Sequence, residues 1–342
     1  MSQAILRQML GAMELFHYAA RFGGKTFLIH FDSPQSFEEL LTDLRLLESA
    51  KIKLVLLFSP DADLSDLKES QEWGFPFQRL IGGNPEQTKQ ALEQGAVPLM
   101  QPSGLLETLA MADYLKAEKL LFIEGQNPLA AWGEALSHVH LDELIEQGKV
   151  QLGDEWSQPA RKNLDLAFVP ALSGNLYLEI FTHQGSGTLV TQSLDKEIRQ
   201  ASLKDVMDIS LLMKPYIEDK IILPVSLDEI AAEIDHYRVA YVNQELVATA
   251  RLKPWENSFE LSKFCTLPRY RGKGTARALC ERLIKDARAS EAKLLFALSI
   301  DQKMWKFFAD FGLSEIDKSE LPPDWREGYD VNRPSRALGM RL

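Results

Sequence analysis

The sequence predicts two domains of different fold class, an α/β domain followed by an α+β domain. The length of 342 residues is too great for one ordinary core and suits two domains of roughly 150 residues each. The first half alternates β-rich apolar runs with helical segments, whereas the second half places consecutive strands between helices. A polar stretch without an apolar pattern lies at residues 192–197. We therefore predict domains at residues 1–192 and 197–342.

The first domain begins with an amphipathic helix and continues in strand–helix–strand order. Residues 1–22 place charged side chains among apolar ones at helical spacing and lack the continuous apolar run of a signal peptide. Residues 25–31 are almost continuously apolar, as expected for a strand buried on both faces of a sheet. The elements predicted after these are helix 37–49, strand 53–58, helix 85–94, strand 96–100, helix 105–117, strand 119–123, strand 165–169 and helix 176–181. This order predicts a mostly parallel sheet with helices on both faces.

The second domain follows a different order, in which three consecutive strands lie between helices. The predicted elements are helices 203–216 and 227–234, strands 237–242, 246–252 and 259–267, helix 275–289, strand 293–299 and helix 302–311. A strand meander flanked by helices is typical of an α+β fold.

Composition and charge exclude several classes of protein. Hydrophobic residues at 45% and charged residues at 25% are typical of globular proteins. The formal net charge of −11 argues against a nucleic-acid or membrane partner, because both need clustered positive charge, and favours a small-molecule ligand. The two cysteines, Cys265 and Cys280, form no C-x-x-C pair, so we expect no disulfide framework and no metal, and a cytoplasmic location fits. No apolar run approaches the roughly 20 residues that span a bilayer.

The sharpest local motif is the segment 271–276, Arg-Gly-Lys-Gly-Thr-Ala, between a β-rich run and an amphipathic helix. A helix start offers unpaired N–H groups and a positive dipole end, and glycines let the backbone approach a phosphate closely. The segment therefore predicts a phosphate-binding turn, the alternative being a solvated turn that caps the helix. Arg271, Gly274 and Ala276 match the R/Q-x-x-G-x-G/A pattern of GNAT acetyltransferases, in which this turn holds the pyrophosphate of CoA. This resemblance implies acetyl-CoA as co-substrate.

Longer segments in both halves resemble the N-acetylglutamate synthase family, which joins an amino-acid-kinase-like domain to a GNAT domain. In the second half, residues 198–206 resemble the family's opening segment and residues 332–336 its closing strand. In the first half, residues 110–123 and 176–190 resemble segments of the kinase-like domain. The resemblance covers nearly the whole chain. It implies an amino-acid N-acetyltransferase that transfers acetyl from acetyl-CoA to the α-amine of L-glutamate, in arginine biosynthesis.

The kinase-like domain departs from the family where a kinase would hold its nucleotide. The family has a lysine and a Gly-Gly pair after the first strand, whereas this chain has His30, Asp32 and Ser33 there. A nucleotide triphosphate needs that cation and those N–H groups, and Asp32 would repel phosphate, so no kinase activity is expected. Arginine-regulated relatives bind arginine in this domain beside a mobile first helix, which residues 2–22 resemble. The resemblance thus implies an L-arginine effector and a homo-oligomer.

Acetyl transfer to an amine requires a base for the ammonium proton and donors for the developing oxyanion. Glu260, at the start of strand 259–267, stands where the resembling synthases carry their general-base glutamate, the alternative being a solvated carboxylate at a strand edge. The resemblance also implies that main-chain N–H groups near Cys265 and Thr266 polarise the thioester. The general acid stays open, because Phe308 stands at the place of a common tyrosine and Ser299 is the nearest upstream hydroxyl. The predicted cofactor-binding residues are Cys265, Thr266, Leu267, Arg271, Gly272, Lys273, Gly274, Thr275 and Ala276.

Recognition of glutamate requires cations for two carboxylates. Arg333 matches a substrate arginine in the family's last strand, but the second arginine position falls at Pro224 and Val225. Lys263, expected on the alternate face of the strand that carries the base, or Arg251 on the neighbouring strand could compensate. The acceptor therefore stays open between glutamate and another amino acid or small amine. A non-catalytic protein that binds arginine or acyl-CoA is a further alternative, but the candidate base beside an intact loop favours an enzyme.

Overall fold

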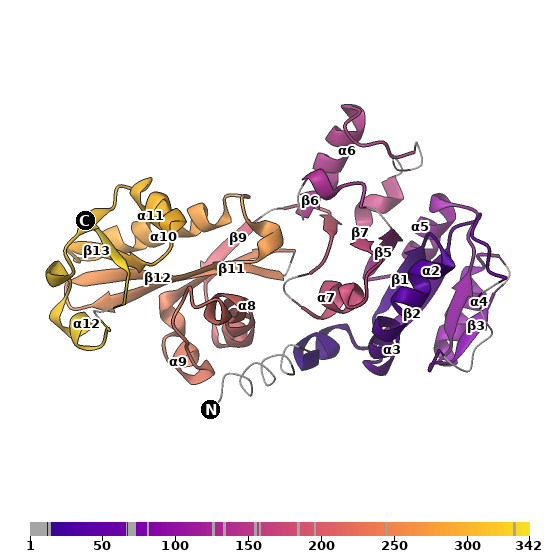
Figure 1. Cartoon of the computed structure of the whole chain (residues 1–342), viewed down its shortest axis with the longest axis horizontal. Helices are drawn as coiled ribbons and strands as arrows, with labels where there is room; N and C mark the ends of the chain where they lie inside the picture. Colours follow the sequence, from indigo (N-terminus) through magenta and orange to yellow (C-terminus); the bar gives the residue numbers. More distant parts are fainter. Residues whose placement is uncertain are drawn as a thin grey trace. The chain divides into compact units, whose positions relative to one another are not determined.

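The computed structural model describes residues 12, 15–65, 67, 73–80, 82–124, 127–132, 135–153, 156, 159–182, 185–194, 196–243, 245–330 and 333–342. The chain divides into two compact units, Met1–Leu194 and Asp195–Leu342, each built on its own sheet (Figure 1). The division falls within the stretch 192–197 where the sequence places the boundary. Most of the predicted first helix lies outside the described residues, and residues 15–22 are helical. Among the residues described, no helix is both long and apolar enough to cross a membrane.

The first unit contains an eight-stranded sheet in the order β3-β4-β2-β1-β5-β7-β8-β6. The strands are β1 Thr26–Phe31, β2 Lys53–Phe58, β3 Phe77–Arg79, β4 Val97–Met100, β5 Lys119–Glu124, β6 Ala135–Ser137, β7 Asp165–Pro170 and β8 Thr188–Thr191. Neighbouring strands are parallel except β7 and β8. The predicted mostly parallel sheet is therefore confirmed.

Helices cover both faces of this sheet. They are α2 Pro34–Glu39, α3 Leu41–Ser49, α4 Pro85–Glu93, α5 Leu105–Tyr114, α6 His138–Glu146 and α7 Asn175–Phe181. Alternate residues of β1 enter two separate hydrophobic clusters, Phe27 and Ile29 one of them and Leu28 the other, because successive side chains of a strand point to opposite faces. The single helix predicted for 37–49 is wrong. It is broken at Leu40, whose N–H donates to the Phe37 carbonyl in a tight turn.

Carboxylates occupy the carboxyl edge of the first sheet. Asp32 follows β1 directly and Glu124 ends the neighbouring strand β5. Burial and the charge of Asp32 raise the pKa of Glu124 to about 7, and burial raises the pKa of Asp32. The Ser33 side chain accepts the Ser36 N–H at 3.3 Å and so caps α2. This edge, where open α/β sheets usually bind ligands, is therefore unfavourable for phosphate.

The second unit contains a seven-stranded sheet in the order β14-β15-β13-β12-β11-β10-β9. The strands are β9 Lys196–Gln200, β10 Tyr237–Val242, β11 Glu245–Trp255, β12 Ser258–Thr266, β13 Leu294–Ser299, β14 Ser314–Ile316 and β15 Arg336–Arg341. All neighbours are antiparallel except β12 and β13. The sequence analysis did not predict β9 or β14, because both are edge strands with largely exposed, polar residues.

The helices of the second unit cover both faces of its sheet. They are α8 Val206–Glu218, α9 Leu227–Ala232, α10 Thr275–Arg288, α11 Gln302–Ala309 and α12 Pro323–Glu327. Helices α8 and α9 lie on one face and α10 on the other (Figure 1). Strands β12 and β13 pair only along Ser258–Leu261 and Leu294–Ala297, and then continue without pairing to each other. This opening in the middle of the sheet positions the candidate site.

Candidate active site

The turn between β12 and α10 has the features of an anion site. Gly272 and Gly274 both have φ of 74°, a left-handed conformation that glycine adopts without strain. The first turn of α10 leaves N–H groups without partners inside the helix at its positive dipole end. The Thr275 side chain beside them is 2% exposed, and its hydroxyl has no hydrogen-bond partner among the described residues. A phosphate group fits these donors.

Cations surround this turn. Arg271 is exposed and Lys273 is half-buried. Lys196, on β9, donates a hydrogen bond to the Lys273 carbonyl, and its Nζ lies 3.9 Å from the position of a Cβ built on Gly274. Burial and the charge of Lys273 lower the pKa of Lys196. Sequence reasoning missed Lys196 because β9 is far from the loop in sequence and no local pattern marks the contact.

The main-chain groups at the end of β12 alternate in direction. Leu267 donates its N–H to the Val247 carbonyl and Cys265 pairs with Thr249, so the main-chain groups of both residues face β11. Because hydrogen bonding alternates along a strand, the main-chain groups of Thr266 face the other way. The Cys265 N–H is therefore directed at β11, whereas the Thr266 N–H is directed away from β11 and donates to the Tyr216 hydroxyl. Burial raises the pKa of the Cys265 thiol, which stays a packed, protonated side chain.

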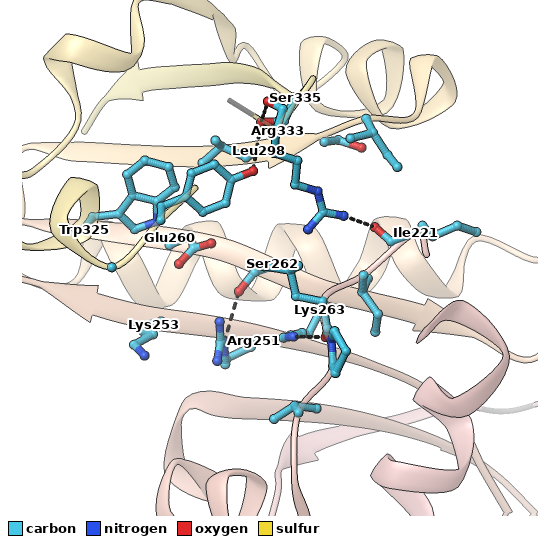
Figure 2. Close-up of a pocket in the computed structure, with 18 of the residues that line it drawn as sticks. Ile221, Arg251, Lys253, Glu260, Ser262, Lys263, Leu298, Trp325, Arg333 and Ser335 are labelled. Atoms are coloured by element: carbon cyan, nitrogen blue, oxygen red, sulfur yellow. Dashed lines mark hydrogen bonds between the residues drawn. The ribbon is translucent and has the colours of Figure 1, made fainter. Parts of the chain in front are cut away.

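A pocket of about 360 Å³ lies beside the unpaired part of β12 (Figure 2). Strands β11 and β12, the end of β13, the loop at residues 221–225 and the segment 325–335 contribute side chains to it. Figure 2 shows Glu260 and Ser262 of β12 close to Arg251 of β11, with Arg333 and Ser335 reaching in from the opposite side. The pocket thus gathers acidic and basic groups from distant parts of the sequence.

Glu260 lies in this pocket and not at a solvated edge. Its Oε2 accepts a hydrogen bond from the Trp255 indole N–H at 3.2 Å. Burial raises the pKa of Glu260, and the positive charge of Arg251 opposes that shift. A carboxylate with a raised pKa binds a proton more strongly than an ordinary glutamate, so it can accept one from an ammonium group.

Lys263 shares the pocket with Glu260, and the prediction that it faces the alternate side is wrong. The pairing with β11 shifts between Thr249 and Arg251, and Lys263 has φ of 56°. This β-bulge turns the chain, so the period of two that holds in a regular strand fails here. The Lys263 ammonium donates to the Leu223 carbonyl at 2.8 Å. Burial and the charge of Arg251 lower the pKa of Lys263 to about 8.

Arg333 also makes hydrogen bonds to the loop that Lys263 contacts. Its guanidinium donates to the carbonyl oxygens of Lys220 and Ile221 at 3.3 and 3.4 Å. In the described part of the chain neither Arg333 nor Lys263 has a carboxylate within ion-pair distance, so both are available to an anionic ligand. The residue before Arg333, which is part of the predicted motif, lies outside the described residues.

The remaining charges of the pocket are already paired. Arg251 and Lys253 each contact the carboxylate of Glu233 at 2.6 Å. Arg251 is therefore held by a carboxylate that it shares with Lys253, whereas Lys263 and Arg333 have no carboxylate partner among the described residues. Pro224 and Val225 line the pocket with apolar surface, at the position of the family's second arginine.

The two residues considered in connection with the general acid, Phe308 and Ser299, have different surroundings. Phe308 is buried and packs against Phe264 with ring centroids 5.5 Å apart, which makes it a core residue. Ser299, at the end of β13, lines the pocket and accepts the Asp301 N–H at 3.0 Å. Ser299 is thus a hydroxyl that lines the same pocket as the candidate base. No group of three or more His, Cys, Asp or Glu side chains in the described ranges could hold a metal ion.

The model of the Acetyltransferase (GNAT) family matches residues 203–313, which include β10 to β13, α8 to α11 and the turn before α10. Residues 203–313 are a GNAT domain. The GNAT domain contains the glycine turn, the strand opening and Glu260, and the pocket is completed by residues 325–335 beyond the match.

Relatives and one solved structure extend the similarity to the first unit. The chain is 29% identical over 276 residues to an amino-acid acetyltransferase of Azotobacter vinelandii, covering 73% of this chain and 63% of the relative. It is 28% identical over 246 residues to an amino-acid acetyltransferase of Actinobacillus pleuropneumoniae, covering 67% and 56%. The chain thus spans less than two thirds of either relative.

The fold resembles a crystal structure of N-acetylglutamate synthase from Neisseria gonorrhoeae complexed with coenzyme A and L-arginine. The TM-score is 0.57 at 20% identity, and the match covers 96% of this chain and 98% of that one. The two chains therefore share the same overall fold in both units.

Proposed function

We propose that this protein is an acetyl-CoA-dependent amino-acid N-acetyltransferase with L-glutamate as acceptor. The observation that carries the proposal is one pocket that joins the candidate base, Glu260, to Lys263 and Arg333, two cations with no carboxylate partner among the described residues. The pocket adjoins the strand opening of a GNAT domain. The names of the relatives, amino-acid acetyltransferase, support the same reaction class.

The turn before α10 would hold the pyrophosphate of the cofactor. Gly272 and Gly274 let main-chain N–H groups approach it, the Thr275 hydroxyl is unpaired among the described residues, and Arg271 and Lys273 supply positive charge. When bound, acetyl-CoA supplies a thioester whose carbonyl carbon is open to attack by an amine.

Glu260 would prepare the acceptor for that attack. An α-ammonium group carries no free electron pair, so it must first lose a proton, directly or through a water molecule. The raised pKa of Glu260 brings its proton affinity closer to that of the amine and makes the transfer less unfavourable. Ser299, which lines the same pocket, is our candidate to donate a proton to the departing thiolate.

Lys263 and Arg333 would bind the carboxylates of the acceptor. Both cations border the loop at residues 220–223, so they would fix an amino acid at one end of the pocket. Arg333 offers a guanidinium fork suited to a carboxylate, and Lys263 offers a single point charge. Two cations match the two carboxylates of glutamate.

A second candidate acceptor is an amino acid with an apolar side chain. Pro224 and Val225 line the pocket together with Ile222, Leu223 and Leu298. In that case Lys263 and Arg333 would share one α-carboxylate, and the acceptor side chain would pack against this apolar surface.

The test is a thiol-release assay on the full chain with acetyl-CoA and a panel of amino acids, glutamate first and leucine as the apolar comparison. We expect release of CoA with glutamate and formation of N-acetylglutamate, identified by NMR. Release with leucine and not with glutamate would replace the proposed acceptor. No release with any amino acid, while acetyl-CoA binds, would favour the non-catalytic alternative.

A further inference from the structure

Tyr216, on α8, makes contacts at the end of β12 that have no part in the proposed reaction. Its hydroxyl donates to the Thr266 carbonyl at 2.6 Å and accepts the Thr266 N–H at 2.9 Å. One phenolic oxygen thus satisfies both main-chain groups of the last residue of β12. Burial raises the pKa of Tyr216, so the hydroxyl keeps its proton near neutral pH and can make both bonds.

Thr266 lies on the part of β12 that β13 leaves uncovered. Pairing between the two strands ends at Leu261 and Ala297, and the main chain of Thr266 faces away from β11. An extended ligand can bind such a free strand edge through main-chain hydrogen bonds, as an added strand does. The pantetheine arm of CoA is an extended chain with two amide groups. Thr266 therefore offers the N–H and C=O that such an arm needs.

The same tyrosine is linked to the cofactor turn. The Arg271 guanidinium donates to the Tyr216 hydroxyl at 3.2 Å and to the Thr266 carbonyl at 3.4 Å. The guanidinium carbon lies 5.4 Å from the centre of the Tyr216 ring. The Tyr216 side chain therefore lies between the glycine turn, where the pyrophosphate would bind, and the strand edge where the arm would continue.

We propose that the Tyr216 hydroxyl competes with the pantetheine arm for the main chain of Thr266. In the free protein Tyr216 occupies this edge of β12, and it leaves Thr266 when the arm binds. Tyr216 is then a positioning residue that sets the affinity for the cofactor's arm and not for its nucleotide. The inference rests on the proposed function only in taking a CoA thioester as ligand.

The test compares two ligands by calorimetry on the full chain. CoA contains the arm, whereas 3′-phosphoadenosine 5′-diphosphate contains the adenosine, the 3′-phosphate and the pyrophosphate without it. The variant Tyr216→Phe keeps the ring and removes the hydroxyl. Because the arm no longer has to break one or two net hydrogen bonds, we expect CoA to bind roughly 3- to 30-fold more tightly. The affinity for the nucleotide should change by no more than about twofold.

A matched control is Tyr241→Phe in the same unit. The Tyr241 hydroxyl donates to Asp205 at 2.6 Å and takes no part in the cofactor turn, so both affinities should stay at the parental values. Unchanged or weaker binding of CoA by Tyr216→Phe would overturn the inference while leaving the proposed function intact. Equal weakening for both ligands would show that Tyr216 only supports Arg271, which also overturns it. If the parent bound neither ligand, the proposed function itself would fail, and the inference with it.

Discussion

Glu260 and Lys263 lie three residues apart on β12, and the bulge at Lys263 places both in one pocket. Their environments change their proton affinities in opposite directions. Burial raises the pKa of Glu260 and lowers the pKa of Lys263 to about 8, because in each case it disfavours the charged form. Each shift leads to a measurable dependence on substitution or pH.

The variant Glu260→Gln should lose the base and keep the shape of the side chain. We expect turnover to fall on the order of a hundredfold or more, with little change in affinity for acetyl-CoA. The deficit should shrink as pH rises, because a larger fraction of the amine arrives deprotonated. Steady-state kinetics from pH 6.5 to 9.5 measure both effects. The control is Glu256→Gln, which changes an exposed glutamate in a turn. Parental turnover of Glu260→Gln at neutral pH would mean that another group is the base, and His236 is the histidine nearest to it in sequence.

Lys263 should make binding of the product pH-dependent. N-acetylglutamate has no amine to titrate, so its affinity reports on the protein's cations. Lys263 is charged below its pKa of about 8 and neutral above it, so the affinity should fall as pH rises from 7 to 9. Calorimetry at several pH values checks this. The variant Lys263→Met should bind N-acetylglutamate weakly at every pH. The variant Arg333→Ala should also bind it weakly, but its affinity should still fall as pH rises. A parental affinity that does not change with pH would contradict the assignment of Lys263.

At the scale of elements, Gly274 in the cofactor turn has a left-handed backbone that a β-branched residue adopts only with strain. Gly274→Val should therefore remove the rise in thermal midpoint that acetyl-CoA gives the parent by binding only the folded state. Gly95→Val is a matched control, because Gly95 has φ of 78° in the first unit, outside the turn. The control should lose intrinsic stability and keep the ligand-induced rise. A Gly274→Val protein with the parental rise would show that the turn does not bind the cofactor.

The sequence predicts the longer apolar strands well, but it misses the short buried strand β8 and the polar edge strands β9 and β14. Runs such as Lys53–Phe58 are apolar throughout because both sheet faces are covered, so the pattern itself marks the strand. Strand β9 has mainly polar, exposed residues, and its pairing with β10 is a contact between distant segments that no local pattern reveals. Short strands such as β14 are hidden for the same reason.

The candidate site shows the same division. The glycine turn is predicted from a local motif, and Glu260 is predicted from its place in the strand that the family resemblance indicates. The position of Lys263 was missed because it depends on a bulge, which is a property of backbone torsion and not of residue type. The contacts of Tyr216 with Thr266 and of Lys196 with Lys273 were missed because each joins segments distant in sequence.

At the scale of the whole molecule, the carboxyl edge of the sheet in the first unit carries acidic groups where a kinase would need a cation. Asp32 and Glu124 lie at the edge where a nucleotide phosphate would approach, and they would repel it. Calorimetry with magnesium and ATP should show no heat of binding to the full chain once its second unit is saturated with CoA. Micromolar affinity would contradict the assignment of this unit as a non-kinase domain. An L-arginine effector and assembly into a homo-oligomer stay predictions from the family resemblance.

The uneven hydrogen bonding along β12 should also appear in the rates at which its amide protons exchange. The amides of Ser258–Leu261 lie between two neighbouring strands, whereas those further along have β11 on one side only, and the Thr266 amide depends on a single phenolic oxygen. Amide protons at the end of β12 should therefore exchange with deuterium sooner than those at its beginning. A ligand that fills the opening should slow exchange at this end of the strand and at the first turn of α10, and leave the first unit unchanged. Mass spectrometry would then locate the cofactor by protection alone, without any turnover.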